Sequence, residues 1–96
     1  MKLVLAVYNM AADEEVMEAV RSAGVEHYTK WPRVLGAGRT GPRLDEHVWP
    51  GANCVLLMAL PEDGAARVLE ALRALGETVG RNEGLRAFVV PIEAAI

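Results

Sequence analysis

Hydrophobic and polar residues alternate in blocks along the chain, and the first blocks predict a strand followed by a helix. The β-branched and aliphatic run Lys2–Tyr8 predicts a strand, and Asn9 after it is suited to a turn or a helix cap. Within Asp13–Ala23, apolar residues recur at helical spacing, and acidic residues stand at the dipole-positive start. Gly24 then provides a signal for the end of the helix.

The middle of the chain predicts a strand and a long loop. Val25–Val34 is rich in β-favouring side chains, but Pro32 cannot donate a hydrogen bond to a neighbouring strand and therefore indicates an edge position or a bulge. The segment Gly36–Gly51 contains four glycines and two prolines, which predict a long exposed loop. Loops longer than about 12 residues in compact domains are usually functional.

The second half of the chain repeats the order of strand and helix. The apolar run Ala52–Leu60 predicts a buried strand, and Pro61 with the acidic residues after it predicts the start of a second helix. The apolar stripe of this helix ends at Gly76 or Gly80, either of which can terminate it. Leu85–Ile92 predicts the last strand.

The order β-α-β-β-α-β predicts a single domain over residues 1–96 with an α+β, ferredoxin-like fold, in which an antiparallel sheet carries both helices on one face. The other face would meet water in a monomer, yet residues 3–7, 55–58 and 87–90 are apolar at consecutive positions. Because soluble monomers rarely expose a contiguous apolar patch, we expect other copies of the chain to cover this face.

Composition narrows the choice of partners and compartment. The 10 Lys and Arg residues against 13 Asp and Glu residues give a net charge of −3, so nucleic acid is not an expected partner. The single cysteine, Cys54, lies among apolar residues and is expected to be a reduced, buried thiol, which favours a cytoplasmic location. The first apolar run is too short for a signal peptide, and no segment approaches the roughly 20 apolar residues of a membrane span.

Residues suited to catalysis are few, and the expectation is that the protein is not an enzyme. The only serine, Ser22, has no nucleophile-elbow pattern around it, and the paired acidic residues stand at helix starts, where the helix dipole explains them. A ferredoxin-like enzyme remains a distant alternative because such folds host many chemistries.

Three stretches resemble the P-II nitrogen-regulatory proteins and their P-II-like relatives. Gly36-Ala37-Gly38-Arg39 follows the second predicted strand, a glycine-bounded segment over residues 80–85 precedes the last strand, and Phe88-Val89-Val90-Pro91-Ile92-Glu93 lies in that strand. Each stretch is short, but their order and spacing match the family over nearly the whole chain.

The resemblance implies a cytoplasmic homotrimer that takes part in nitrogen regulation or related signalling. It further implies that an adenine nucleotide (ATP, ADP or AMP) binds in the clefts between subunits and that the loop between the second and third strands contacts a target protein. Glycine lets the backbone approach phosphate closely, and arginine adds a bidentate charged donor. The candidate effector-binding residues are Gly36, Gly38, Arg39, Gly80, Arg81, Gly84 and Arg86.

The chain also departs from the family pattern. The loop is shorter than in typical members, and Gly36–Gly51 contains no tyrosine, so uridylylation is not expected. The sequence stops at Ile96, without the basic C-terminal segment that helps to hold nucleotide in typical members. The expected ligand is therefore a small anionic effector, with an adenine nucleotide as one candidate.

A metal-binding trimer is the alternative function. His47 lies beside Glu46 in the long loop, and a neighbouring carboxylate can orient a histidine for metal binding. A threefold assembly would present three such histidines, and some P-II-like and CutA-like trimers are linked to metals. His47 is therefore the candidate metal ligand.

Overall fold

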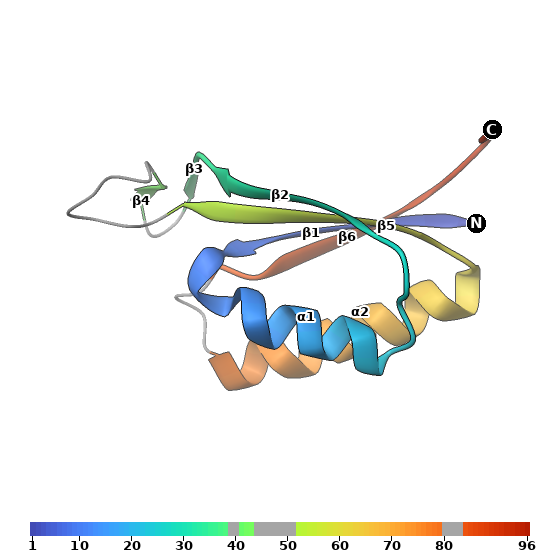
Figure 1. The fold of residues 1–96 in the computed structure, drawn as a ribbon, viewed down its shortest axis with the longest axis horizontal. Helices are drawn as coiled ribbons and strands as arrows, with labels where there is room; N and C mark the ends of the chain where they lie inside the picture. The colour runs from blue at the N-terminus through green and yellow to red at the C-terminus, as the bar shows by residue number, and fades with distance from the viewer. Residues whose placement is uncertain (39–40, 44–51, 80–83) are drawn as a thin grey trace.

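Four strands form an antiparallel sheet, and both helices pack on one face of it (Figure 1). The strand order is β2-β5-β1-β6, which confirms the predicted α+β, ferredoxin-like fold. The computed structural model describes residues 1–38, 41–43, 52–79 and 84–96. In chain order, the elements are β1 (Lys2–Asn9), the short 3-10 helix η1 (Met10–Ala12), α1 (Asp13–Ser22), β2 (Thr29–Val34), β3 (Gly36–Gly38), β4 (Gly41–Arg43), β5 (Asn53–Leu60), α2 (Glu62–Val79) and β6 (Arg86–Pro91).

Local signals at both ends of the first helical segment act as the sequence predicts. The side chain of Asn9 accepts a hydrogen bond from the backbone N–H of Ala11 at 2.9 Å, which caps η1. After α1, Gly24 has a φ of +99°, a backbone conformation that favours glycine, and its N–H donates to the carbonyl of Arg21. The chain therefore leaves α1 sharply and returns toward the sheet.

Two glycines predict opposite responses to alanine. Gly24→Ala is expected to lower the free energy of unfolding by about 1 kcal/mol, because an L side chain strains this backbone conformation. Gly76→Ala is expected to raise it by about 0.5–1 kcal/mol, because alanine favours helix and its Cβ would meet only Leu85 at an ordinary 3.7 Å. Urea unfolding of both variants tests the pair, and a destabilised Gly76→Ala variant would contradict the account of α2.

Three boundaries differ from the sequence prediction. Helix α2 continues through Gly76 to Val79, because the helix keeps its apolar face on the sheet and a glycine inside a helix costs only about 1 kcal/mol. Strand β2 begins at Thr29 rather than at Val25, since residues 25–28 cross from the helix layer back to the sheet. The predicted long loop begins instead with a two-stranded ribbon, in which β3 pairs antiparallel with β4.

The core lies between the sheet and the helices. Along β1, the side chains of Val4, Ala6 and Tyr8 face the helices and are fully buried, and alternate residues of β5 match them. Helices α1 and α2 close this layer with their own apolar stripes. The buried core residues are Val4, Ala6, Tyr8, Ala12, Val16, Met17, Val20, Val25, Cys54, Leu56, Met58, Ala65, Val68 and Leu72.

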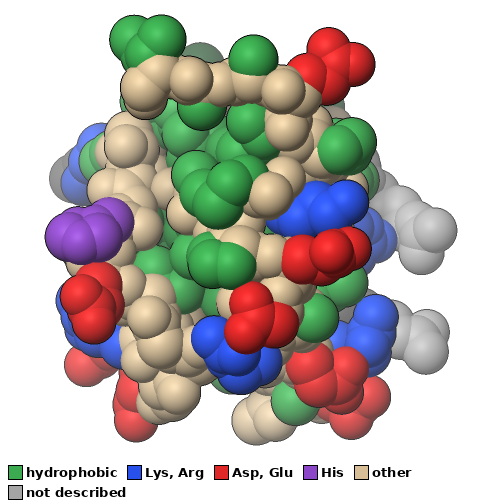
Figure 2. Space-filling view, turned by 90° about the vertical axis from the view of Figure 1, so that its right-hand side faces the viewer, with side chains coloured by type: hydrophobic (Ala, Val, Ile, Leu, Met, Phe, Trp, Pro, Cys, Tyr) green, Lys and Arg blue, Asp and Glu red, His purple; other side chains and the backbone are tan. Residues whose placement is uncertain are grey.

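The opposite sheet face, here called the open face, is also apolar. Leu5 pairs with Leu57 on one side and with Phe88 on the other, so three apolar residues lie in one row across the sheet. Phe88 is 54% exposed, and Trp31 and Val90 on the same face are 47% and 45% exposed. Figure 2, which shows the end that carries both termini, has hydrophobic side chains mainly over the sheet half and most charged side chains over the helical half.

Candidate functional site

Two of the segments with predicted site residues lie at the same end of the sheet (Figure 1). Strand β1 ends there, and its antiparallel neighbours β5 and β6 begin there. Strand β2 also ends there and leads into β3. The structure therefore brings Gly36–Gly38 and residues 84–86 to one edge of the fold, which we call the loop end.

The two segments nevertheless lie on opposite sides of the loop end. Strands β2 and β6 are the two edges of the sheet, and β5 and β1 separate them. With neighbouring strands about 4.8 Å apart, the separation is about 14 Å. A small anion that touches one segment therefore leaves the other free to contact a second molecule.

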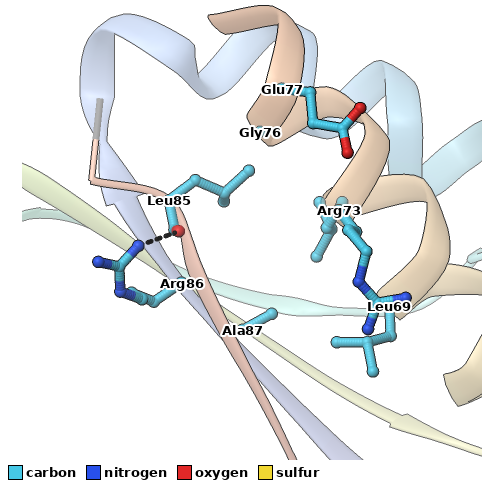
Figure 3. Close-up of a pocket in the computed structure, with 8 residues that line it drawn as sticks. Leu69, Arg73, Gly76, Glu77, Leu85, Arg86 and Ala87 are labelled. Carbon is cyan, nitrogen blue, oxygen red and sulfur yellow. Dashed lines mark hydrogen bonds between the residues drawn. The ribbon is translucent and has the colours of Figure 1, made fainter. Parts of the chain in front are cut away.

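Arg86 supplies a cation at the loop end. Because it pairs with Val7, its side chain belongs to the open face. Its guanidinium donates to the backbone carbonyl of Leu85 at 3.1 Å (Figure 3), and within the described part of the chain it has no carboxylate partner. Gly84, two residues before it, has a φ of +63°. The guanidinium thus keeps donors for an anion such as phosphate or carboxylate.

Apolar side chains accompany this cation across the open face. Trp31 pairs with Val55, Val55 with Val7, and Val7 with Arg86, so the four residues form one row across all four strands. An exposed tryptophan can stack on a planar group, and arginine binds an anion. The row therefore suits a ligand with a planar part and an anionic part, or the face of another subunit.

Glycine has a packing role at the start of β3. A Cβ on Gly36 would lie 3.3 Å from the side-chain amide of Asn53, the first residue of β5. Any larger residue would push against Asn53 where the two segments leave the sheet. Gly38 pairs with Gly41 in the ribbon.

The remaining predicted site residues are Arg39, Gly80, Arg81 and His47, which lie outside the described residues, so their roles stay predictions. Across residues 1–38, 41–43, 52–79 and 84–96, no group of three or more His, Cys, Asp or Glu side chains could hold a metal ion.

A groove of about 690 Å³ lies on the helix side of the sheet, between α2 and β6. Leu69, Leu72 and Leu85 contribute its apolar lining, and Arg73 stands on its α2 wall. Arg73 already pairs with Glu70 at 2.6 Å, and Figure 3 shows the Arg86 side chain directed away from α2. The predicted cation therefore serves the open face rather than this groove.

A polar cluster beneath the loop end was not predicted from the sequence. The carboxylate of Asp13 accepts hydrogen bonds from the Tyr8 hydroxyl at 2.7 Å and from Lys30 Nζ at 2.9 Å. The Cys54 thiol lies 3.8 Å from the same carboxylate. These four residues, which we call the Asp13 cluster, join α1 to β1, β2 and β5.

The protonation states of the Asp13 cluster follow from burial and hydrogen bonding. Burial raises the pKa of Asp13, but hydrogen bonds from Tyr8 and Lys30 outweigh it and hold the pKa below its ordinary value. Burial, together with the bond to Asp13, raises the pKa of the Tyr8 hydroxyl far above its ordinary value. Burial also raises the pKa of the Cys54 thiol. At neutral pH, the carboxylate is charged and both neighbours stay protonated as donors.

The comparisons with known proteins follow the fold. The family model of the nitrogen regulatory protein P-II matches residues 1–96, so the chain belongs to this family of regulatory proteins. No curated protein matches the sequence. Among the residues described, no helix is both long and apolar enough to cross a membrane.

Solved structures with the same fold come from two organisms. CPII, a nitrogen regulatory PII-like protein from Thiomonas intermedia K12, was solved with ADP, AMP and bicarbonate; the chain is 22% identical to it, with a TM-score of 0.76 over 93% of this chain and 82% of that one. A protein from Thermus thermophilus, described as a PII-like signaling protein, is 26% identical, with a TM-score of 0.69 over 93% of this chain and 83% of that one. These similarities confirm the family fold.

Proposed function

We propose that the protein is a PII-like regulator that binds a small anionic effector, an adenine nucleotide, in the clefts between the subunits of a homotrimer. In this proposal, the segment Gly36–Gly51 acts on a partner protein. The cytoplasm is the expected compartment, because the family acts on soluble effectors and targets.

The observation that carries the proposal is the position of Arg86. A guanidinium without a carboxylate partner among the described residues stands on the open face, at the end of the sheet where β3 also begins. The apolar open face supports assembly, because its exposed aromatic and aliphatic side chains need a cover. Assembly through this face would place the Arg86 cation at the edge of a subunit contact.

The structures of CPII with ADP, AMP and bicarbonate support the choice of effector class. Arg39, Gly80 and Arg81 complete the proposed site from the two glycine-bounded segments, together with Gly36, Gly38, Gly84 and Arg86. A phosphate group would receive backbone N–H groups from the glycines and charged donors from the arginines.

Ligand-dependent proteolysis tests both parts of the proposal. Trypsin cleaves after arginine, and Arg39 and Arg43 both lie in the segment proposed to contact the partner. Saturating ADP or AMP is expected to slow cleavage at these two sites by about 10-fold or more, because binding energy must be overcome to expose a bound segment. In an Arg86→Ala variant, the same nucleotide concentration is expected to give less protection. Cleavage that is insensitive to nucleotide in the wild-type protein would contradict the proposal.

A further inference from the structure

The Asp13 cluster lies where the segment 36–51 departs from the sheet. Lys30 is the second residue of β2, the strand that leads into this segment, and Cys54 is the second residue of β5, the strand that follows it. Tyr8 is the penultimate residue of β1, and Asp13 is the first residue of α1. One carboxylate therefore bonds to the strands on both sides of the segment.

Strand β2 has a weak backbone attachment at this point. It is an edge strand that pairs only with β5, and its register shifts between Trp31 and Val34. Arg33, within the shifted part, has a φ of +59°, a conformation that non-glycine residues rarely adopt. The backbone pairing therefore leaves room for a side-chain anchor, and Lys30 supplies one immediately before the irregular part.

The cluster has few other ways to satisfy its groups. Tyr8 is fully buried, and its hydroxyl has Asp13 as its acceptor. The side chains of Lys30 and Asp13 are 25% and 31% exposed, so their ion pair is only partly screened by water. Gly36, which follows β2 by two residues, in turn packs against Asn53, the neighbour of Cys54. A chain of contacts thus runs from Asp13 to the start of β3.

We propose that Asp13 is a positioning residue for the base of the segment 36–51. Through Lys30, it fixes strand β2 and, with it, the location of Gly36–Gly38 relative to Asn53. Its effect on the effector rests on the proposed function, whereas its effect on strand position does not.

Variants that separate position from stability test this proposal. Asp13→Asn and Lys30→Met each remove the charge pair while keeping much of the side-chain volume. The triple variant Tyr8→Phe, Asp13→Leu, Lys30→Met replaces the whole polar set by apolar groups, which is often neutral or stabilising overall. The matched control is Arg67→Met, which removes the exposed pair between Arg67 and Asp63 on α2, away from β2.

Backbone hydrogen exchange of the ligand-free protein is the first measurement. Amides of residues 30–36 are expected to exchange about 10-fold faster or more in the two single variants, while amides of β1 change little. The triple variant is expected to keep this local increase even where its urea midpoint equals or exceeds that of the wild type. Arg67→Met is expected to leave residues 30–36 unchanged. Exchange that simply follows global stability, or wild-type protection in the triple variant, would overturn the proposal.

Affinity for ADP is the second measurement. Asp13→Asn is expected to weaken binding by about 10-fold, with the oligomeric state unchanged, because the displaced Gly36–Gly38 no longer meets the ligand in the same place. An affinity equal to that of the wild type would overturn the link to the effector. If the wild-type protein itself binds no ADP, the proposed function fails, and hydrogen exchange still decides the role of Asp13.

Discussion

Replacing Leu57 by Asp is expected to dissociate the assembly or unfold the chain. Leu57 lies on the open face, pairs with Leu5 and Thr29, and is already partly buried within one subunit. Covering the face with another copy would remove an aspartate there from water, and an unpaired buried carboxylate costs several kcal/mol. Sedimentation is expected to show a trimer for the wild type and a monomer or aggregate for Leu57→Asp.

The control for this experiment is Ala66→Asp, which adds the same charge at an exposed position of α2. It is expected to sediment as the wild type does. A stable wild-type monomer of 10.4 kDa at micromolar concentration would contradict assembly through the open face.

Replacing Arg39 by Ala is expected to weaken ADP binding by about 1.5–3 kcal/mol, the scale of a hydrogen bond to a charged group. Arg39→Lys is expected to restore only part of this loss, because a point charge cannot reproduce the planar, bidentate guanidinium. Calorimetric titration measures both variants, and Arg86→Ala is expected to give a loss of similar size if both arginines hold the same anion.

The matched control is Arg67→Ala, since Arg67 lies on α2 and pairs with Asp63 at an exposed site. It is expected to bind ADP as the wild type does. The urea midpoint of each arginine variant is expected to stay close to that of the wild type. Wild-type affinity in both Arg39→Ala and Arg86→Ala would remove these residues from the site.

The sheet could be predicted because its pattern is strong. Apolar residues at consecutive positions over residues 3–7 pointed to two covered faces, and the structure separates them into buried residues beneath the helices and partly exposed residues on the open face. Asn9 and Gly24 carried the local signals for a cap and a helix end, and both act as such. The prediction that Pro32 marks an edge position or a bulge is also confirmed, since β2 is an edge strand with a register shift.

The remaining features depend on contacts between distant residues. Gly76 resembles a helix stop, but packing of α2 on the sheet carries the helix past it. The ribbon of β3 and β4 is held by pairing that glycine-rich composition does not signal. Asp13 looked like a complement to the helix dipole, whereas it bonds to Lys30, 17 residues away. A tyrosine within an apolar run was the only sequence signal of that cluster.

Of the candidate site, sequence reasoning placed the two glycine-bounded segments, and the fold brings the described parts of both to the loop end. It did not predict that they flank opposite edges of the sheet. That separation follows from the strand order and not from any local motif. It is also the reason that a second copy of the chain fits the account: a neighbour can approach one edge while Arg86 remains at the other.

Calorimetric titration of the wild-type protein with ADP tests the central claim most directly. The account predicts saturable binding with a stoichiometry of about one nucleotide per subunit, carried out on protein that sediments as a trimer. It also predicts that binding is lost in the dissociated Leu57→Asp variant, because the cleft needs two subunits. The absence of binding heat for ADP, AMP and ATP at millimolar concentration would contradict the claim that this family member is an adenine-nucleotide-responsive regulator.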